Sequence, residues 1–296
     1  MNLTTLAYIA LALSMVMVGS YVALAAFLVQ HFNLFILIWL RFLIAILFLA
    51  PWLKNLKSLP NLAIRSWVYV FLQSFFGNFL FSIFMLYGVQ LSGSVSAAVI
   101  FSFIPLVVVL LSHLLLHEKL TLRIILAMAC AISAMLLLQL DKADSIRGSW
   151  WGDVLLLGAL LTEGIYVVLG KRLTRNFSPI QIAALMHICG WALVTPLAAW
   201  AIWQYEFSLP APIVWSGLVY YAFAASVASV WLWMYGLNAI PANRAGIFTV
   251  LLPVSTAIFA MFFGAAVSAI QWLVLFIAIA SIALVTTDKK PSEQVN

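Results

Sequence analysis

Long runs of apolar residues, broken by short polar clusters, divide this chain into ten segments. An α-helix needs roughly 20 apolar residues to cross the hydrocarbon core of a bilayer, which is about 30 Å thick. The runs match that length, and most breaks contain charged residues, Pro, Gly or Asn. The predicted spans lie near residues 4–29, 34–53, 66–89, 93–116, 121–140, 150–171, 179–203, 212–236, 242–264 and 269–287. Only tight turns separate the third span from the fourth and the eighth from the ninth.

The composition agrees with a membrane protein. Of the 296 residues, 66% are hydrophobic and 7% are charged, whereas a soluble domain carries about 25% charged residues. So few charges cannot cover a water-facing surface, and backbone amides in lipid must be satisfied inside helices or closed barrels. A barrel would show short alternating segments. We therefore predict an all-α integral membrane fold.

Two local features have ordinary membrane explanations. No Lys or Arg precedes the run from Leu3 to Val29 and no A-x-A site follows it, so we predict a first span there and not a signal peptide. Cys130 and Cys189 both lie inside apolar runs, which does not indicate a disulfide framework.

The loop cations are distributed unevenly between the two sides. With the N-terminus inside, the inner side holds Lys54, Lys57, Arg65, Lys119, Arg123, Lys171, Arg172, Arg175, Arg244, Lys289 and Lys290, and the outer side holds Lys142 and Arg147. Cytoplasmic loops of membrane proteins carry the excess of Lys and Arg. This bias predicts a multi-pass protein of the cell's inner (plasma) membrane with both termini in the cytoplasm. It also explains the net charge of +6 without a nucleic-acid partner.

The two halves of the chain repeat each other. The matched pairs are Gly88/Gly236, Pro105/Pro253 and Tyr87/Tyr235 at an offset of 148 residues, and Gly19/Gly164, Tyr21/Tyr166 and Phe32/Phe177 at an offset of 145. Because each half has an odd number of spans, the second half must enter the membrane from the opposite side. Inverted repeats build transporters with a binding site near the midplane. We predict one five-helix repeat over 1–141, a second over 149–288 and a cytoplasmic tail over 289–296. The two prolines should each bend a helix from within.

Several motifs spread over the whole chain carry a family resemblance. They are Tyr87-Gly88, Ser96-Ala97-Ala98, Ile104-Pro105 and His117-Glu118-Lys119-Leu120, together with Trp39-Leu40-Arg41-Phe42 in the second span and Asp153 and Lys171-Arg172 in the sixth. This pattern resembles the EamA branch of the drug/metabolite transporter (DMT) superfamily. The resemblance implies ten helices in two inverted repeats, a central cavity, and export of amino acids or related metabolites. Exporters of aromatic amino acids are the best-defined relatives for comparison.

The chain departs from the family pattern at three places. Val18 precedes Gly19-Ser20 where the family often has Trp, and Thr162-Glu163 precedes Gly164 in the sixth span. Ala266 occupies the second-half counterpart of Glu118. These departures predict a cavity whose chemistry differs from that of the relatives.

Three ionisable residues within spans are candidates for the site. Glu163 lies near the middle of the sixth span, where a carboxylate is costly and is a functional candidate by default. It could carry a coupling proton or bind a substrate amine, or it could belong to a structural ion pair. Arg41 could bind a carboxylate through its fork of donors, although a structural hydrogen-bonding role is the stronger alternative. His187 could titrate near neutral pH, or it could be an ordinary core histidine.

Aromatic and amide side chains complete the predicted pocket. They are Tyr21, Tyr87, Tyr166 and Tyr235 at repeat-related positions, with Gln73, Asn78 and Trp231 in spans expected to line the cavity. Aromatic walls would suit a zwitterion with an apolar or aromatic side chain. The alternative for each aromatic residue is a place in the interfacial belt or against lipid.

Enzymatic alternatives find little support in the motifs. His113 and His117 lie four residues apart beside Glu118, but a zincin requires H-E-x-x-H. Gly164 to Lys171 has a spacing unlike that of a P-loop, and Arg172 replaces the required Ser or Thr. We therefore predict no metal site, no cofactor and no enzymatic activity.

The resulting prediction is a secondary transporter that exports a small metabolite by alternating access. Protons are the suggested coupling ion, and the partners are the small-molecule substrate and the bilayer. An uptake carrier or exchanger is the alternative within transport. A membrane-embedded enzyme or a non-transporting scaffold is the alternative outside it.

Overall fold

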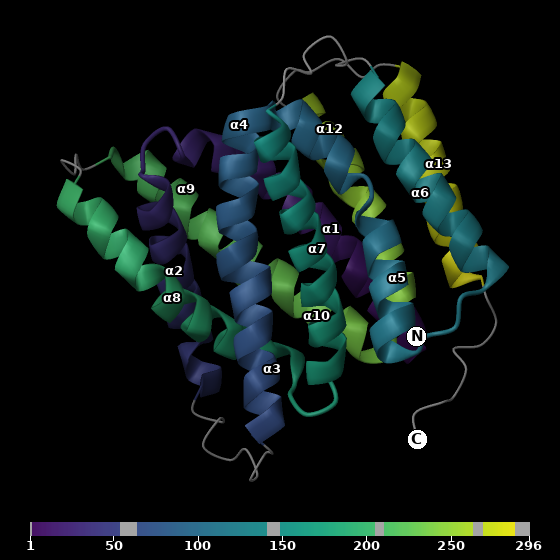
Figure 1. The fold of residues 1–296 in the computed structure, drawn as a ribbon, viewed down its shortest axis with the longest axis horizontal. Helices are drawn as coiled ribbons and strands as arrows, with labels where there is room; N and C mark the ends of the chain where they lie inside the picture. The colour runs from purple at the N-terminus through teal and green to yellow at the C-terminus, as the bar shows by residue number, and fades with distance from the viewer. Residues whose placement is uncertain (1, 54–63, 141–148, 205–209, 263–268, 288–296) are drawn as a thin grey trace.

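The computed structural model describes residues 2–53, 64–140, 149–204, 210–262 and 269–287, and every regular element in these ranges is a helix (Figure 1). The first half contains α1 (Leu3–Leu28), α2 (Leu34–Leu53), α3 (Ile64–Ser74), η2 (Phe75–Leu80), α4 (Phe81–Phe101), α5 (Ile104–Leu116) and α6 (Leu122–Leu140). The second half contains α7 (Trp150–Leu173), α8 (Pro179–Gln204), α9 (Pro212–Ala222), η4 (Phe223–Ala228), α10 (Ser229–Ala239), α11 (Ala242–Ala245), η5 (Gly246–Val250), α12 (Leu251–Phe262) and α13 (Ala269–Thr286). The segments η2 and η4 are π-helical, and η5 is a 3-10 helix.

Six helical stretches of the described chain are long and apolar enough to cross a bilayer. They are Leu3–Tyr21, Leu34–Trp52, Ile64–Ser92, Trp150–Leu173, Pro179–Gln204 and Pro212–Ala239. Shorter apolar helices cover Ile104–Leu116, Leu122–Leu137 and Trp272–Thr286. The predicted ninth span corresponds to the run from α11 through η5 to α12. The all-helical membrane class is therefore confirmed.

The predicted turn between residues 89 and 93 is wrong. Helix α4 continues through these positions to Phe101, and the chain breaks at 102–103, just before α5. Gly88, which suggested a turn, is instead a packing surface, because a Cβ placed there would lie 2.7 Å from Leu156 Cγ. The break falls where Pro105 enters the first turn of α5, a position at which its missing N–H costs nothing.

Both repeat-related prolines lie in the first turn of a helix, and not at mid-helix as expected. Pro105 follows the turn at 102–103, and Pro253 is the third residue of α12, directly after the 3-10 segment η5. In each case the departure from α-helical geometry lies just before the proline.

Local capping explains why other helices begin where they do. At the start of α8, the Gln181 side chain accepts a hydrogen bond from the Ser178 backbone N–H at 2.9 Å, and Ser178 Oγ accepts from the Gln181 N–H at 3.4 Å. This is the reciprocal capping box, which satisfies two amides that the helix cannot. Asn33 Oδ1 accepts from the Phe35 N–H before α2 in the same role.

The helices of the two halves pack crosswise. Helix α1 packs against α10 and α12, and its counterpart α7 packs against α4 and α5. Helix α2 packs against α8, and α6 against α13, which form the two flanks of the bundle (Figure 1).

Two close contacts repeat across the halves at the offsets seen in the sequence. A Cβ at Gly88 would lie 2.7 Å from Leu156 Cγ and 3.2 Å from the carbonyl oxygen of Gly152. A Cβ at Gly236 would lie 2.4 Å from Leu11 Cγ and 3.1 Å from the carbonyl oxygen of Ala7. The glycines are 148 residues apart and their contacts 145 apart, so each half buries its glycine against the first helix of the other half.

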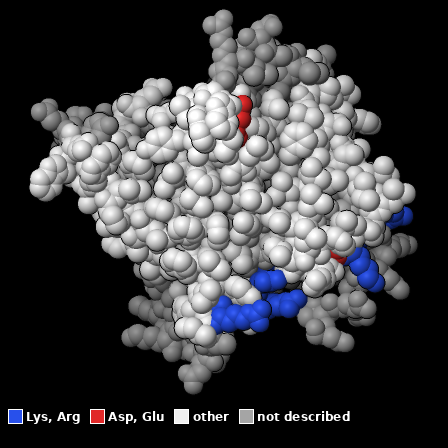
Figure 2. All heavy atoms as spheres, viewed as in Figure 1, with Lys and Arg blue, Asp and Glu red and all other residues white. Residues whose placement is uncertain are grey.

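The Lys and Arg side chains visible in Figure 2 lie toward one end of the bundle, whereas Arg41 lies within α2. The predicted inner cations in this part of the chain are Arg65, Lys119, Arg123, Lys171, Arg172, Arg175 and Arg244. The other four, Lys54, Lys57, Lys289 and Lys290, and the predicted outer pair Lys142 and Arg147, lie outside the described residues. Helix α1 begins at this end, since Tyr8 accepts a hydrogen bond from Arg244 at 3.4 Å.

The two halves are bonded to each other at the same end. The Glu118 carboxylate, just after α5, accepts hydrogen bonds from the backbone N–H groups of Ala242 at 2.7 Å and Asn243 at 2.8 Å. Lys171 Nζ donates to the carbonyl oxygens of Leu237 at 2.5 Å and Ile240 at 2.9 Å. An anion at a helix N-terminus and a cation at a C-terminus are both favourable for the helix dipole.

Candidate functional site

Arg41 lies within α2 and is held by aromatic rings. Its Nη1 donates a hydrogen bond to the Tyr221 hydroxyl of α9 at 3.2 Å. The guanidinium carbon lies 4.7 Å from the ring centre of Phe42 and 5.6 Å from that of Tyr221. Arg41 Nε is buried and has no hydrogen-bond partner in the described part of the chain. Because a buried donor without a partner is costly, a ligand oxygen bound here would remove that cost.

Tyr21 lies near both this arginine and Glu163. The Tyr21 ring meets Tyr221 edge to face with centroids 5.4 Å apart. Tyr21 is close enough to both Arg41 and Glu163 to interact electrostatically with each. The described residues supply no hydrogen bond to the Glu163 carboxylate. One cation and one carboxylate therefore lie near the same tyrosine, and each has unused hydrogen-bonding capacity.

The first π-helical segment contributes Asn78 and Gly77 to the same region. Asn78 is buried, and its Nδ2 donates to the Met186 carbonyl oxygen of α8 at 3.2 Å. A Cβ at Gly77 would lie 2.4 Å from Tyr166 Cδ2, so glycine is needed for the close approach of this ring. π-helical turns occur frequently at functional sites.

The second π-helical segment lies 148 residues after the first and carries Ser226 at the position of Asn78. Ser226 is 1% exposed, and its hydroxyl has no hydrogen-bond partner in the described chain. Trp233 Nε1 of α10 is also buried without a partner there. These groups add to the unmet hydrogen-bonding capacity of the bundle interior.

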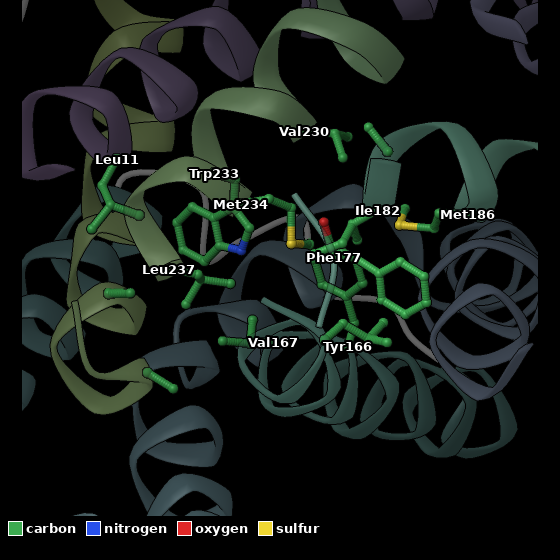
Figure 3. Packing of buried hydrophobic residues seen from close by; sticks show 14 of the residues in the cluster. Leu11, Tyr166, Val167, Phe177, Ile182, Met186, Val230, Trp233, Met234 and Leu237 are labelled. Atoms are coloured by element: carbon green, nitrogen blue, oxygen red, sulfur yellow. The ribbon is translucent and has the colours of Figure 1, made fainter. Parts of the chain in front are cut away.

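Apolar packing encloses the region from the side of α10. Figure 3 shows Met234 and Leu237 of α10 converging with Tyr166 and Val167 of α7. Gln73 is 1% exposed, and its Nε2 lies 4.0 Å from Met234 Sδ, a weak contact for an amide.

His187 is surrounded by protein. It is 2% exposed, its Nδ1 lies 2.7 Å from the Ala183 carbonyl oxygen, and its ring meets Phe42 edge to face at 5.4 Å. These contacts match the core-histidine alternative, and they also place the ring next to the residue that supports Arg41.

Three predicted site residues lie farther out. Tyr87 is 43% exposed and Trp231 is 41% exposed. Tyr235 is partly buried, and its ring centroid lies 6.2 Å from that of Trp231. They make no described contact with the Arg41 and Glu163 region, so their place in the site stays a prediction.

The sequence analysis missed Tyr221, Ser226 and Trp233. The repeat offset of 148 would have found the first two, because it relates Gln73 to Tyr221 and Asn78 to Ser226. Trp233 has no such signal, since its importance depends on an unbonded indole that only the packing reveals.

The histidine pair has local structural roles. His113 Nδ1 lies 2.9 Å from the Glu118 carbonyl oxygen, and His117 adopts the left-handed conformation (φ 57°) that ends α5. Among the described residues, no three His, Cys, Asp or Glu side chains come together as a metal site.

A single family model, that of the EamA-like transporter family, matches this chain twice, over residues 5–140 and 150–287. The chain belongs to the EamA-like transporter family. The resemblance suggested by the sequence motifs is therefore confirmed. The chain is a membrane transporter by family.

Two curated proteins of Bacillus subtilis (strain 168) are similar to this EamA-family chain. "Uncharacterized transporter YetK" is 33% identical over 256 residues, which cover 85% of this chain and 78% of that protein. "Uncharacterized transporter YyaM" is 24% identical over 201 residues, which cover 66% and 65%. One crystal structure of another protein matches with a TM-score of 0.76 at 18% identity, covering 93% of this chain and 94% of that one, which shows a shared fold.

Proposed function

We propose that this EamA-family transporter exports small zwitterionic metabolites, of which amino acids are the leading class, across the inner membrane by alternating access. Arg41 binds the substrate carboxylate, and Glu163 binds the amine or carries the coupling proton. The observation that carries the proposal is that Tyr21 interacts with two opposite charges, Glu163 and Arg41, and that Arg41 Nε is buried without a hydrogen-bond partner among the described residues. The ends of an α-amino acid carry these two opposite charges.

Alternating access requires two halves that move around the site. The two matches to one family model and the crosswise Gly88 and Gly236 contacts support two inverted five-helix repeats. Arg41 and Tyr21 come from the first half, and Glu163 and Tyr221 from the second. A substrate that engages all four would respond to any movement between the halves.

The orientation follows from the basic end of the bundle. Seven of the eleven predicted inner cations lie in the described chain, and the Lys and Arg side chains visible on the surface in Figure 2 lie toward one end. We assign that end to the cytoplasm, because cytoplasmic loops carry the cationic excess. Export is the direction that the family resemblance suggests.

A flux assay in liposomes with a panel of radiolabelled amino acids tests the proposal. We expect at least one zwitterionic substrate to be moved faster than by empty liposomes. Glu163→Gln keeps the shape and removes the charge, so it should weaken substrate affinity by about tenfold or more if the amine binds there. If Glu163 carries the proton, the same change should instead flatten the pH dependence of flux.

The matched control is Asp153→Asn, which removes a carboxylate from the first turn of α7. This variant should keep wild-type flux for the same substrate. A Glu163→Gln protein that is folded and shows the wild-type rate, affinity and pH profile would exclude both roles for this carboxylate.

A further inference from the structure

A second polar site lies at the basic end of the bundle, away from Arg41 and Glu163. It is a pocket of about 480 Å³ between α3, the end of α5 and the end of α7. Its lining includes three arginines, Arg65, Arg172 and Arg175. Arg172 follows Glu163 by nine residues on α7, which at 1.5 Å per residue separates the two sites by about 13 Å along the helix.

Neutral oxygens hold the arginines of this pocket in place. The Tyr69 hydroxyl accepts hydrogen bonds from Arg65 Nε at 2.8 Å and from Arg172 Nη1 at 3.3 Å. Arg172 Nη2 donates to the Leu115 carbonyl oxygen at 2.6 Å. One phenol therefore orients two guanidinium groups without cancelling the charge of either.

The positive charge of the pocket has no local acid to balance it. None of its lining residues in the described chain is Asp or Glu. The carboxylate of Glu118, which follows His117 in sequence, is already bonded to the N–H groups of Ala242 and Asn243. A guanidinium has five N–H donors, so Arg65 and Arg172 keep donors beyond the bonds described above.

The rest of the lining suits a phosphorylated ligand. Asn176 Nδ2 donates to Ser66 Oγ at 3.0 Å, which provides polar groups beside the arginines. Leu115 and Leu116 form an apolar side. Arginine forks match phosphate oxygens in geometry as well as charge. The volume is larger than a free phosphate ion requires and leaves room for the group that a phosphate ester carries.

We propose that this pocket binds a phosphate-bearing anion, held by Arg65, Arg172 and Arg175. The phosphate comes either from an anionic lipid headgroup or from a soluble phosphate compound. Basic pockets between membrane helices on the cytoplasmic side bind lipid headgroups. Because α3 and α5 belong to the first half and α7 to the second, the bound anion stabilises the arrangement of the halves seen here.

Thermal unfolding of the purified protein in a neutral detergent tests the shared chemistry. Inorganic phosphate should raise the melting temperature more than chloride at equal ionic strength. The double variant Arg172→Gln/Arg175→Gln should weaken the apparent phosphate affinity at least tenfold. Lys119→Gln removes a cation from the same end but outside the pocket, and should keep the wild-type response.

A second arm identifies the source of the phosphate. The protein is placed in nanodiscs of phosphatidylcholine with or without phosphatidylglycerol, and lipid retention is measured by native mass spectrometry. Retention of phosphatidylglycerol by the wild type, lost in the double variant, assigns the site to lipid. Phosphate-dependent stabilisation without such retention assigns it to a soluble phosphate compound.

The outcomes that overturn the proposal are distinct. They are no stabilisation by phosphate over chloride together with no preferential lipid retention, or a response that Lys119→Gln weakens as much as the double variant. Either result would mean that these cations serve only to orient the protein in the membrane. Arg65→Gln provides a second test if the double variant does not fold, since Arg65 is exposed and its loss removes one guanidinium.

Discussion

The contact of Glu118 with the start of α11 joins the two halves at the basic end, and its removal gives the sharpest mechanical test. The carboxylate accepts two hydrogen bonds, from Ala242 N–H at 2.7 Å and Asn243 N–H at 2.8 Å. We call this contact between the end of α5 and the start of α11 the seam. Ala242 is fully buried and Asn243 is 2% exposed, so water does not replace the Glu118 carboxylate as acceptor while the seam is closed. We predict that Glu118→Ala favours separation of α5 from α11.

The size of the effect follows from the two bonds. A hydrogen bond to a charged group contributes about 1.5–3 kcal/mol, so the two together contribute about 3–6 kcal/mol to the closed seam. Once the seam opens, water solvates the N–H groups of Ala242 and Asn243, and we therefore take about 3 kcal/mol, the lower end of this range. A change of about 3 kcal/mol shifts the equilibrium about a hundredfold. Glu118→Gln keeps one oxygen acceptor and should shift it about tenfold.

Thiol labelling at Val108 measures this opening. Val108 is fully buried, and its Cγ1 would lie 2.6 Å from a Cβ on Gly246 across the seam. In a background without Cys130 and Cys189, Val108→Cys should react slowly with a maleimide in detergent. Glu118→Ala should raise that rate by up to a hundredfold. Asp153→Asn, in the first turn of α7 and away from the seam, should leave the labelling rate of Val108→Cys unchanged.

A second buried reporter separates seam opening from unfolding. Ser281 is fully buried between α13 and α6, where its hydroxyl donates to the Ala127 carbonyl oxygen at 2.8 Å. Ser281→Cys should keep its slow rate when Glu118 is replaced. An unchanged Val108→Cys rate would refute the reasoning, and so would an equal increase at both reporters.

Three further predictions concern substrate binding, packing and orientation. Arg41→Lys keeps the charge but loses the fork, and should weaken substrate affinity about tenfold in the liposome assay; unchanged affinity would remove Arg41 from the site. Gly88→Ala places a methyl group 2.7 Å from Leu156 Cγ and should destabilise the fold by about 1–3 kcal/mol. Thermal unfolding checks this against Gly217→Ala, where the nearest atom is 3.3 Å away, and equal melting temperatures would contradict it. Ser208 lies outside the described residues, in the predicted loop between the seventh and eighth spans. A cysteine at this position should react with an impermeant reagent from outside intact cells, and reaction only after lysis would contradict the proposed topology.

The sequence predicted the helical class because lipid leaves few options. With only 7% charged residues, the chain cannot form a surface that faces water, and its apolar runs have the length of a bilayer span. It also predicted which cations lie at the same end of the bundle, because the Lys and Arg residues of short loops set the orientation of a protein in the membrane. The place where one helix ends and the next begins was less accessible. Gly88 suggested a turn, but the sequence does not distinguish a glycine that lets Leu156 pack closely from a glycine that forms a turn.

For the candidate site, too, the sequence identified some residues, and only the structure showed how they contact one another. Glu163 and Arg41 stand out in the sequence because charged side chains inside apolar runs are costly and need a reason. Arg41 Nε has no hydrogen-bond partner among the described residues, and Tyr21 lies near both charges. Tyr221 contacts both Arg41 and Tyr21, which lie about 180 and 200 residues away from it in the chain, so this arrangement depends on the packing of distant helices. The π-helical segments belong to this second class, because residues such as Gly77 and Asn78 fit an α-helix equally well until Tyr166 and Met186 pack against them. Composition and charge thus determined that the chain spans a membrane and which residues are costly there, while only the tertiary packing decided which of those residues face one another.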